Sequence, residues 1–208
     1  MSELCSQIEG HMRDLKLKCI IPVYRDLLER ATANNLQYEE YLALLLEEAV
    51  KRKTESSVKA RINKSRLPYL KTIEEFDFSY QPGLKEKEVI RLSSLEFIEQ
   101  KGNVLFLGPP GVGKTHLSVG LAMKACMARY RVLFMTAQQL IEDLMLSKKD
   151  GSIVEKLMAY SRLNLLVIDE LGYMPITREQ ANLLFQLISM RYETRSRCLK
   201  QRRCYPYQ

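Results

Sequence analysis

The sequence predicts an α/β protein with helices on both faces of a parallel sheet, preceded by a small all-helical region. Three short apolar runs, at 103–107, 132–135 and 163–168, alternate with segments whose apolar residues recur every three or four positions. This alternation is typical of parallel strands connected by helices. A chain of 208 residues with 46% hydrophobic content can form one ordinary domain with an appendage.

Residues 1–66 are expected to be helical throughout, because their apolar residues follow helical steps and no run alternates as a strand does. The residues that carry this pattern are Leu15, Cys19, Val23, Tyr41, Leu42, Leu45, Leu46, Ala49 and Val50. Residues 67–83 then bring two prolines, a glycine and several aromatic residues, which is typical of a connector lying over the next domain. The aromatic side chains either cover a bound base or only pack on the domain.

The helices of the second region, residues 84–196, have their own sequence signals. The helix after the first strand is expected to bury one face, formed by Leu117, Leu121, Ala122 and Ala125. A second helix should begin near Thr136. Thr177, with Gln180 three residues later, forms a capping box that should open a third helix.

Residues 197–208 are predicted to be a basic tail without a strand. Their sequence, RCLKQRRCYPYQ, neither alternates nor gathers apolar residues, and a proline near its end would not suit a central strand.

Charge is arranged in blocks within a net charge of +7. Residues 51–66 contain seven basic residues and one acidic residue, and the last 18 residues contain six basic residues and one acidic residue. Such blocks indicate partners rather than a fold. A helix over 51–66 could bind the phosphate backbone of DNA without reading its sequence, or it could present an ordinary solvated face. Both interpretations stay open, because Val58 and Ile62 are its only large apolar residues.

The composition also bears on the compartment. No uncharged run reaches the roughly 20 residues needed to cross a bilayer, and the first 25 residues carry charge throughout. We therefore expect neither membrane insertion nor secretion. The five cysteines show no CxxC spacing and only two histidines accompany them, which favours reduced thiols in the cytoplasm.

The stretch GPPGVGKT, residues 108–115, fits the pattern G-x-x-x-x-G-K-[ST] between a buried strand and a helix. Its glycines allow successive amides to face one point, and the helix N-terminus adds its dipole, so the loop should hold phosphate oxygens. Lys114 would reach the outer phosphates, and the Thr115 hydroxyl would coordinate Mg²⁺. The expected ligand-binding residues are Gly108, Pro109, Pro110, Gly111, Val112, Gly113, Lys114, Thr115 and His116. For His116 we favour a packed or hydrogen-bonded ring over a catalytic role.

The third strand ends in Asp169 and Glu170. Both carboxylates should emerge at the carboxyl edge of the sheet, beside the phosphate loop. There Asp169 can hold Mg²⁺ through water, and Glu170 can orient or deprotonate an attacking water, so Glu170 and Lys114 are the candidate catalytic residues. The alternative is that two acidic residues merely end a strand.

With these residues in place, the chain resembles the IstB family, the helper ATPases of insertion-sequence transposition. Four stretches carry the resemblance: RLPYLKTIEEFDFSYQP, NVLFLGPPGVGKTHLSVGLA, RVLFMTAQQLIEDL and LLVIDELGYMPITREQANLLFQLISMRYE. The family is related to the DnaC helicase loader within the AAA+ class of P-loop NTPases. The resemblance implies an ATPase core that uses ATP and Mg²⁺, an N-terminal part that binds DNA or a transposase, and ATP-dependent homo-oligomers on DNA.

The resemblance extends over about residues 10–196 and then stops. Family members continue into an apolar strand that ends in Thr-Ser-Asn, and the family's strand order, 5-1-4-3-2, places it between the strands that carry the phosphate loop and the acids. We therefore expect a truncated core that lacks its fourth strand and the lid that follows it, and that binds ATP with impaired hydrolysis. The alternatives are a helicase-loader ATPase and a non-catalytic protein that only binds DNA or a transposase.

Overall fold

The computed structural model describes residues 3–80, 83–172, 175–193 and 197–202. The chain forms two compact units, Met1–Lys59 and Ala60–Gln208. The division lies inside the long helix α3 (Tyr38–Lys64) and therefore comes before residue 66, where we expected the helical region to end. Residues 60–66 thus belong to the second unit.

The first unit is helical, as predicted. It consists of α1 (Glu3–Asp14), α2 (Tyr24–Ala33) and most of α3. Its core contains the buried residues Met12, Ile20, Tyr24, Leu27 and Ala49, with Tyr41, Leu44 and Leu45 packed against them. At its surface, the Glu9 carboxylate accepts hydrogen bonds from Arg25 at 2.9 Å and from Arg13 at 3.2 Å.

The second unit is built on a parallel sheet with the strand order β1-β4-β3-β2. The strands are β1 (Val104–Leu107), β2 (Val132–Thr136), β3 (Leu165–Asp169) and β4 (Arg197–Arg202). All three adjacent pairs are parallel. The α/β prediction and the three strands predicted from apolar runs are confirmed.

Strand β4 corrects the expectation for the C-terminal segment. We predicted that no strand would form after residue 196, yet Arg197–Arg202 pairs with β1 on one side and with β3 on the other. The local sequence has little strand propensity, but a slot between two strands supplies hydrogen-bond partners on both sides, and this context outweighs propensity. The fourth position of the sheet is therefore occupied in this chain. Residues 203–208 of the expected tail lie outside the described residues.

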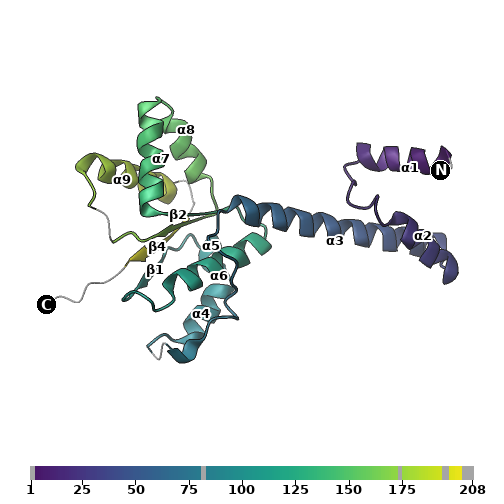
Figure 1. Cartoon of the computed structure of the whole chain (residues 1–208), viewed down its shortest axis with the longest axis horizontal. Helices are drawn as coiled ribbons and strands as arrows, with labels where there is room; N and C mark the ends of the chain where they lie inside the picture. Colours follow the sequence, from purple (N-terminus) through teal and green to yellow (C-terminus); the bar gives the residue numbers. More distant parts are fainter. Residues whose placement is uncertain (1–2, 81–82, 173–174, 194–196, 203–208) are drawn as a thin grey trace. The chain divides into compact units, whose positions relative to one another are not determined.

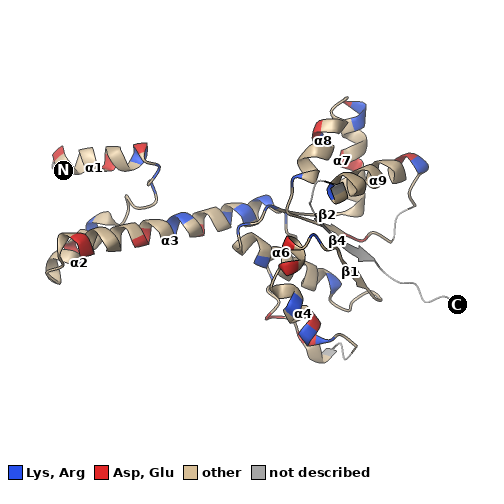
Figure 2. Cartoon of the chain, turned by 180° about the vertical axis from the view of Figure 1, so that it is seen from behind, with Lys and Arg blue, Asp and Glu red and all other residues tan. Residues whose placement is uncertain are grey.

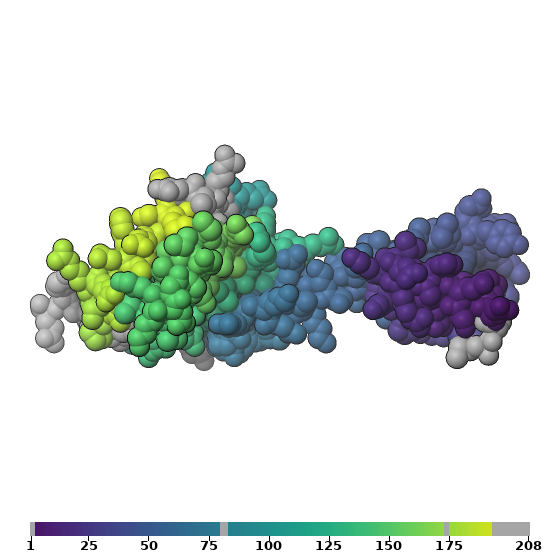
Figure 3. Space-filling model, turned by 90° about the horizontal axis from the view of Figure 1, so that it is seen from above, coloured from purple at the N-terminus to yellow at the C-terminus, as the bar shows by residue number. Residues whose placement is uncertain are grey.

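Helices cover both faces of the sheet (Figure 1). One face carries α4 (Glu86–Ser93), α5 (Glu96–Glu99) and α6 (Lys114–Met127). The other carries α7 (Ala137–Lys149), α8 (Ile153–Ser161) and α9 (Arg178–Glu193), whose outer surface is seen in Figure 3. Alternate strand residues serve the two layers: Val132, Phe134, Leu165 and Val167 pack in the α6 layer, whereas Met135, Leu166 and Ile168 pack in the other.

Two helices of this unit begin where predicted, and the structure has a capping box at Thr136, which was not predicted, as well as the predicted one at Thr177. The Thr136 hydroxyl accepts from the Gln139 amide at 3.2 Å, and the Gln139 side chain accepts from the Thr136 amide at 3.0 Å. Thr177 and Gln180 make the same reciprocal pair, at 3.3 and 2.9 Å. These capping boxes satisfy amides that the first helical turn leaves without partners.

Two polar contacts fix α8 within its layer. The buried Arg191 guanidinium of α9 donates to the carbonyls of Tyr160, at 2.6 Å, and Leu163, at 3.2 Å, which lie at the end of α8 and just beyond it. Asp143 of α7 accepts hydrogen bonds from Tyr160 and Lys156 of α8. Burial raises the pKa of Tyr160, and the bond to Asp143 raises it further.

The end of α3 is joined to the sheet of the second unit. Ile62 packs in the α6 layer, and the carbonyl of Ser65 accepts a hydrogen bond of 2.8 Å from the Phe134 amide of β2. Part of the outer edge of β2 is thereby paired. Across the described ranges, no helix is both long enough and apolar enough to span a membrane.

Candidate functional site

The loop between β1 and α6 requires glycine at two of its turns. Gly111 and Gly113 have φ angles of 81° and 83°, in the left-handed region that residues with a side chain rarely adopt. Gly113 is also held by packing, since a Cβ atom there would lie 2.4 Å from the Phe76 ring. Phe76 belongs to the connector, so the connector packs against the phosphate loop at Gly113.

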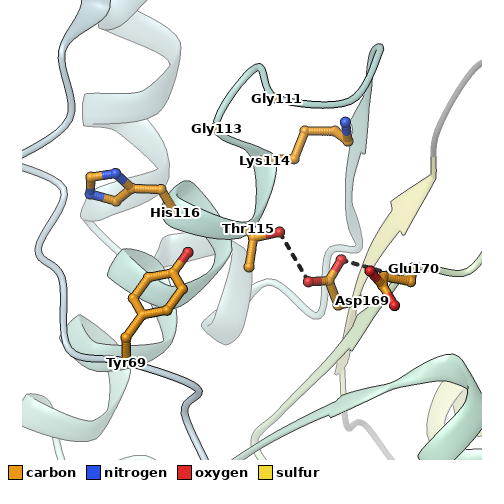
Figure 4. Close-up of a pocket in the computed structure, with 8 residues that line it drawn as sticks. All are labelled: Tyr69, Gly111, Gly113, Lys114, Thr115, His116, Asp169 and Glu170. Carbon is orange, nitrogen blue, oxygen red and sulfur yellow. Dashed lines mark hydrogen bonds between the residues drawn. The ribbon is translucent and has the colours of Figure 1, made fainter.

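Lys114 is the first residue of α6 and is 7% exposed. Its ammonium donates to the carbonyls of Gly108, at 2.9 Å, and Pro109, at 2.6 Å. A buried ammonium needs such partners. The side chain thus lies folded along the loop that it follows in the sequence (Figure 4).

The two acidic residues reach the same place from β3. The Thr115 hydroxyl of α6 donates to Asp169 at 3.0 Å, and the Glu170 amide donates to the other Asp169 oxygen at 2.7 Å, as Figure 4 shows. Asp169 is 7% exposed and Glu170 is exposed. Glu170 has a φ of 59°, a left-handed conformation that the bond to Asp169 helps to hold.

These groups line one cavity of about 230 Å³. Its walls are Tyr69, Gly111, Gly113, Lys114, Thr115, His116, Asp169 and Glu170. Residues separated by more than 50 positions in the sequence therefore meet at the carboxyl edge of the sheet, as the topology of a parallel sheet requires.

His116 is held by the connector. Its Nε2 atom lies 2.8 Å from the carbonyl of Thr72, and its ring packs edge-on against Phe76 with the centroids 5.3 Å apart. This geometry fits the hydrogen-bonded and packed ring that we favoured over a catalytic role.

Tyr69 is an aromatic residue of the connector that lines this cavity, and the sequence left open whether such residues cover a bound base or only pack on the domain. It is 39% exposed, and both burial and the nearby charge of Asp169 raise the pKa of its hydroxyl. The available signal was weak, because Tyr69 is one of several aromatic residues in the connector and only the fold distinguishes it from Phe76, which is buried.

The remaining predicted binding residues lie elsewhere on the loop. Gly108, Pro109 and Val112 line a second cavity of about 170 Å³, together with Lys114 and apolar side chains that include Phe106 and Leu117. Pro110 is exposed.

A metal at the main cavity would not be bound by a large protein cluster. Within the described part of the chain, no group of three or more His, Cys, Asp and Glu residues could hold a metal ion. Thr115 and Asp169 alone offer adjoining oxygen atoms, which suits an ion that keeps water and takes further oxygens from a bound phosphate.

The sequence was compared with known protein families and structures. The pattern of the IstB-like ATP-binding proteins matches residues 10–205. The chain belongs to this family. The match continues beyond residue 196, so the segment 197–205, which we expected to be unlike the family, falls within it.

Individual proteins of insertion sequences are also similar to this chain. The chain is 40% identical over 190 residues to an ATP-binding protein of insertion sequence IS21 from Pseudomonas aeruginosa. The alignment covers 91% of this chain and 72% of the relative. It is 38% identical over 187 residues to the corresponding protein of IS5376 from Geobacillus stearothermophilus, covering 90% and 74%. Both relatives are proteins of bacterial insertion sequences.

Solved structures show the same fold. The DnaC helicase loader superposes with a TM-score of 0.55 at 23% identity, covering 71% of this chain and 81% of DnaC. AMPPCP-bound DnaA from Aquifex aeolicus gives a TM-score of 0.56 at 21% identity, covering 68% and 44%. The predicted fold, a layered parallel sheet with a phosphate loop after its first strand, is therefore shared with these structures.

Proposed function

We propose that this IstB-like protein binds Mg²⁺-ATP in the cavity at Lys114 and uses the nucleotide to control binding of DNA and a transposase during transposition. The observation that carries the proposal is the meeting of the loop 108–115 with Asp169 and Glu170 on one cavity, with Thr115 bonded directly to Asp169. Phosphoryl transfer depends mainly on positioning and charge neutralisation, and these groups supply both.

Each group has a defined part in this proposal. The loop amides and the N-terminus of α6 bind phosphate oxygens. The Lys114 ammonium exchanges the carbonyls of Gly108 and Pro109 for the outer phosphates, which offer a stronger, charge-assisted bond. Thr115 and Asp169 hold Mg²⁺, with Asp169 acting through water.

Hydrolysis is part of the proposal. We expected impaired hydrolysis from the loss of the fourth strand and of the lid that follows it in the family, and β4 occupies the position of that strand between β1 and β3. β3, which ends at Asp169, is therefore paired on both sides, with β2 and with β4. Glu170 lines the cavity with Lys114, where a carboxylate can orient the attacking water.

The proposed contact with DNA uses the basic part of α3 and the residues just after it. Lys51, Lys53, Lys59, Lys64 and Arg66 are all exposed there. Figure 2 shows the basic residues along this part of α3. Because the described side chains in this stretch offer charge rather than a shaped pocket, we expect binding to the phosphate backbone without sequence preference.

Nucleotide binding is tested with Lys114→Ala. Titration of the full chain with a fluorescent ATP analogue in Mg²⁺ should show binding that the variant loses, because the outer phosphates then lack their counter-charge. Lys124→Ala is the matched control, since Lys124 lies on the same helix and makes only a surface ion pair of 3.5 Å with Glu74. Equal affinity in the parent chain and Lys114→Ala would refute the proposed site.

The link to DNA is tested by filter retention of a duplex with and without ATP. We expect retention to depend on nucleotide in the parent chain and not in Lys114→Ala. Replacing Lys59 and Lys64 by alanine should reduce the salt dependence of log affinity by about 0.9 per lost phosphate contact. Replacing the exposed pair Lys148 and Lys149 of α7 is the control. Retention that ignores both ATP and Lys114→Ala would instead identify a non-catalytic DNA-binding protein.

A further inference from the structure

One hydroxyl group in the cavity at Lys114 has no part in the function proposed above. It belongs to Tyr69, which lines the cavity together with Thr115, Asp169 and Glu170. Figure 4 shows the ring of Tyr69 reaching from the connector, with its hydroxyl turned towards α6, where Thr115 lies. Burial raises the pKa of this hydroxyl and the charge of Asp169 raises it further, so the phenol lies within the field of that carboxylate.

The Tyr69 hydroxyl is available to a ligand, whereas its neighbours in the cavity have partners in the protein. The Thr115 hydroxyl donates to Asp169 at 3.0 Å. The Nε2 atom of His116 lies 2.8 Å from the carbonyl of Thr72. No hydrogen bond joins the Tyr69 hydroxyl to any residue that the structure describes, and the side chain is 39% exposed.

The connector is anchored on both sides of Tyr69. Before it, Leu67 packs in the α6 layer, and Pro68 fixes a backbone angle directly ahead of it. After it, Ile73 is 5% exposed and lies so close to α6 that a Cβ atom at Gly120 would come within 2.7 Å of its side chain. The fold therefore limits where the ring can lie before any ligand binds, which lowers the entropy lost when its hydroxyl makes a contact.

The ion in the proposed site needs partners beyond the protein oxygens that bind it. Thr115 and Asp169 offer the adjoining oxygens, and Mg²⁺ in such sites keeps several water ligands. A metal-bound water turns its oxygen to the ion and its protons outward, so the cavity wall has to supply hydrogen-bond acceptors. The phenol oxygen of Tyr69 can accept such a bond, whereas the Lys114 ammonium cannot.

We propose that Tyr69 is a positioning residue for the metal: its hydroxyl accepts a hydrogen bond from a water ligand of the Mg²⁺ that binds with ATP. The inference rests on the proposed function, because it concerns the ion that accompanies the nucleotide. Loss of an outer partner of this kind typically lowers metal affinity by about 10- to 100-fold. The connector thereby becomes part of the site as well as a packing element of the domain.

The first experiment removes only the hydroxyl, because Tyr69→Phe keeps the ring. The affinity of the full chain for a fluorescent ATP analogue is measured at saturating Mg²⁺ and in EDTA. With Mg²⁺ the dissociation constant of Tyr69→Phe should be about tenfold above the parent's, and in EDTA it should equal the parent's. Tyr192→Phe is the matched control, since Tyr192 is 84% exposed on α9 and does not line the cavity.

The second experiment titrates Mg²⁺ at a fixed concentration of the analogue. Half-maximal binding by Tyr69→Phe should require about tenfold more Mg²⁺ than binding by the parent. Urea unfolding of the two chains should have the same midpoint, because the hydroxyl bonds to no other described residue. A misfolded variant would differ from the parent in urea, so this measurement separates an effect on the metal from an effect on the fold.

The outcomes are distinct. Equal affinities of the parent and Tyr69→Phe at every Mg²⁺ concentration overturn the inference. A ring that only covers the base predicts that result, because phenylalanine stacks as tyrosine does. A loss of equal size with and without Mg²⁺ also overturns it. A parent chain that binds no nucleotide refutes the proposed function and this inference together, whereas binding that Lys114→Ala abolishes and Tyr69→Phe leaves unchanged refutes this inference alone.

Discussion

Glu170 has a left-handed backbone conformation, which is rare for a residue with a side chain. It follows a fully buried strand and adopts φ 59°, at a cost of about 1–3 kcal/mol for a residue with a side chain. The bond from its amide to Asp169 holds this turn, and the same carboxylate accepts from Thr115. One aspartate therefore positions both the threonine proposed to bind Mg²⁺ and the residue proposed to activate water.

Glu170→Gln should lower ATP hydrolysis by about a hundredfold or more, because a general base contributes at least this much. Nucleotide affinity should stay the same, since the amide of residue 170 still bonds to Asp169. The measurement is phosphate release under saturating Mg²⁺-ATP beside a binding titration. Glu179→Gln, an exposed glutamate of α9, is the control. Turnover at the parent's rate in Glu170→Gln would exclude the role.

At this scale the sequence predicted the loop residues and the two acids, because a phosphate loop is a local motif and the acids directly follow an apolar strand. It left open whether the connector aromatics cover a bound base or only pack, because the place of Tyr69 on the cavity depends on how the connector folds over α6. It also did not predict the left-handed turn at Glu170, since nothing in Asp-Glu-Leu favours a positive φ.

Among the elements, helices and strands with strong periodicity or capping boxes were predictable, and β4 was not. Helices α7 and α9 start just after Thr136 and Thr177, each of which has a glutamine three residues later. The sequence Arg197–Arg202 offers no such signal, and its pairing is decided by β1 and β3, which lie far away in the chain. Sequence patterns report local preference, whereas a central strand is selected by its neighbours.

The α7–α8 pair supplies a prediction about acid stability. Burial raises the pKa of Asp143, but the hydrogen bonds from Tyr160 and Lys156 outweigh it, and the pKa lies below its usual value. A carboxyl group with a depressed pKa in the folded state contributes stability that is present above its unfolded pKa and is lost as the pH falls through the folded pKa.

Asp143→Asn should therefore destabilise the chain near neutral pH, and the parent's advantage in stability over this variant should shrink as the pH falls. The test is urea unfolding at several pH values from neutral to about pH 3, below the ordinary pKa of aspartate. Asp150→Asn is the control, because Asp150 is exposed just after α7. A difference between parent and Asp143→Asn that does not change with pH would contradict the assignment.

The molecule as a whole divides its proposed tasks between two compact units. The cavity proposed to bind nucleotide lies entirely within Ala60–Gln208, whereas Lys51, Lys53 and Lys59 of the proposed DNA contact lie within Met1–Lys59. The sequence indicated two regions but placed their boundary at the connector. Residues 60–66 join the second unit because Ile62 enters its core and Ser65 pairs with β2.

A fragment that begins at residue 60 should consequently bind Mg²⁺-ATP as the full chain does, because every side chain of the cavity is retained. It should also retain duplex DNA less well than the full chain, since Lys51, Lys53 and Lys59 are gone. Binding titration and filter retention of the fragment measure the two properties, with Lys114→Ala in the fragment as the control. Loss of nucleotide binding by a fragment that remains folded would show that the first unit contributes to the site.

The contact between Gly113 and Phe76 has a consequence for the evolution of this protein. Because a methyl group at position 113 would enter the space of the aromatic ring, the two positions cannot drift independently. A lineage that enlarged residue 113 would have to shrink residue 76 at the same time, and would still bear an unfavourable dihedral. Two sites 37 positions apart should therefore behave in inheritance as a single character.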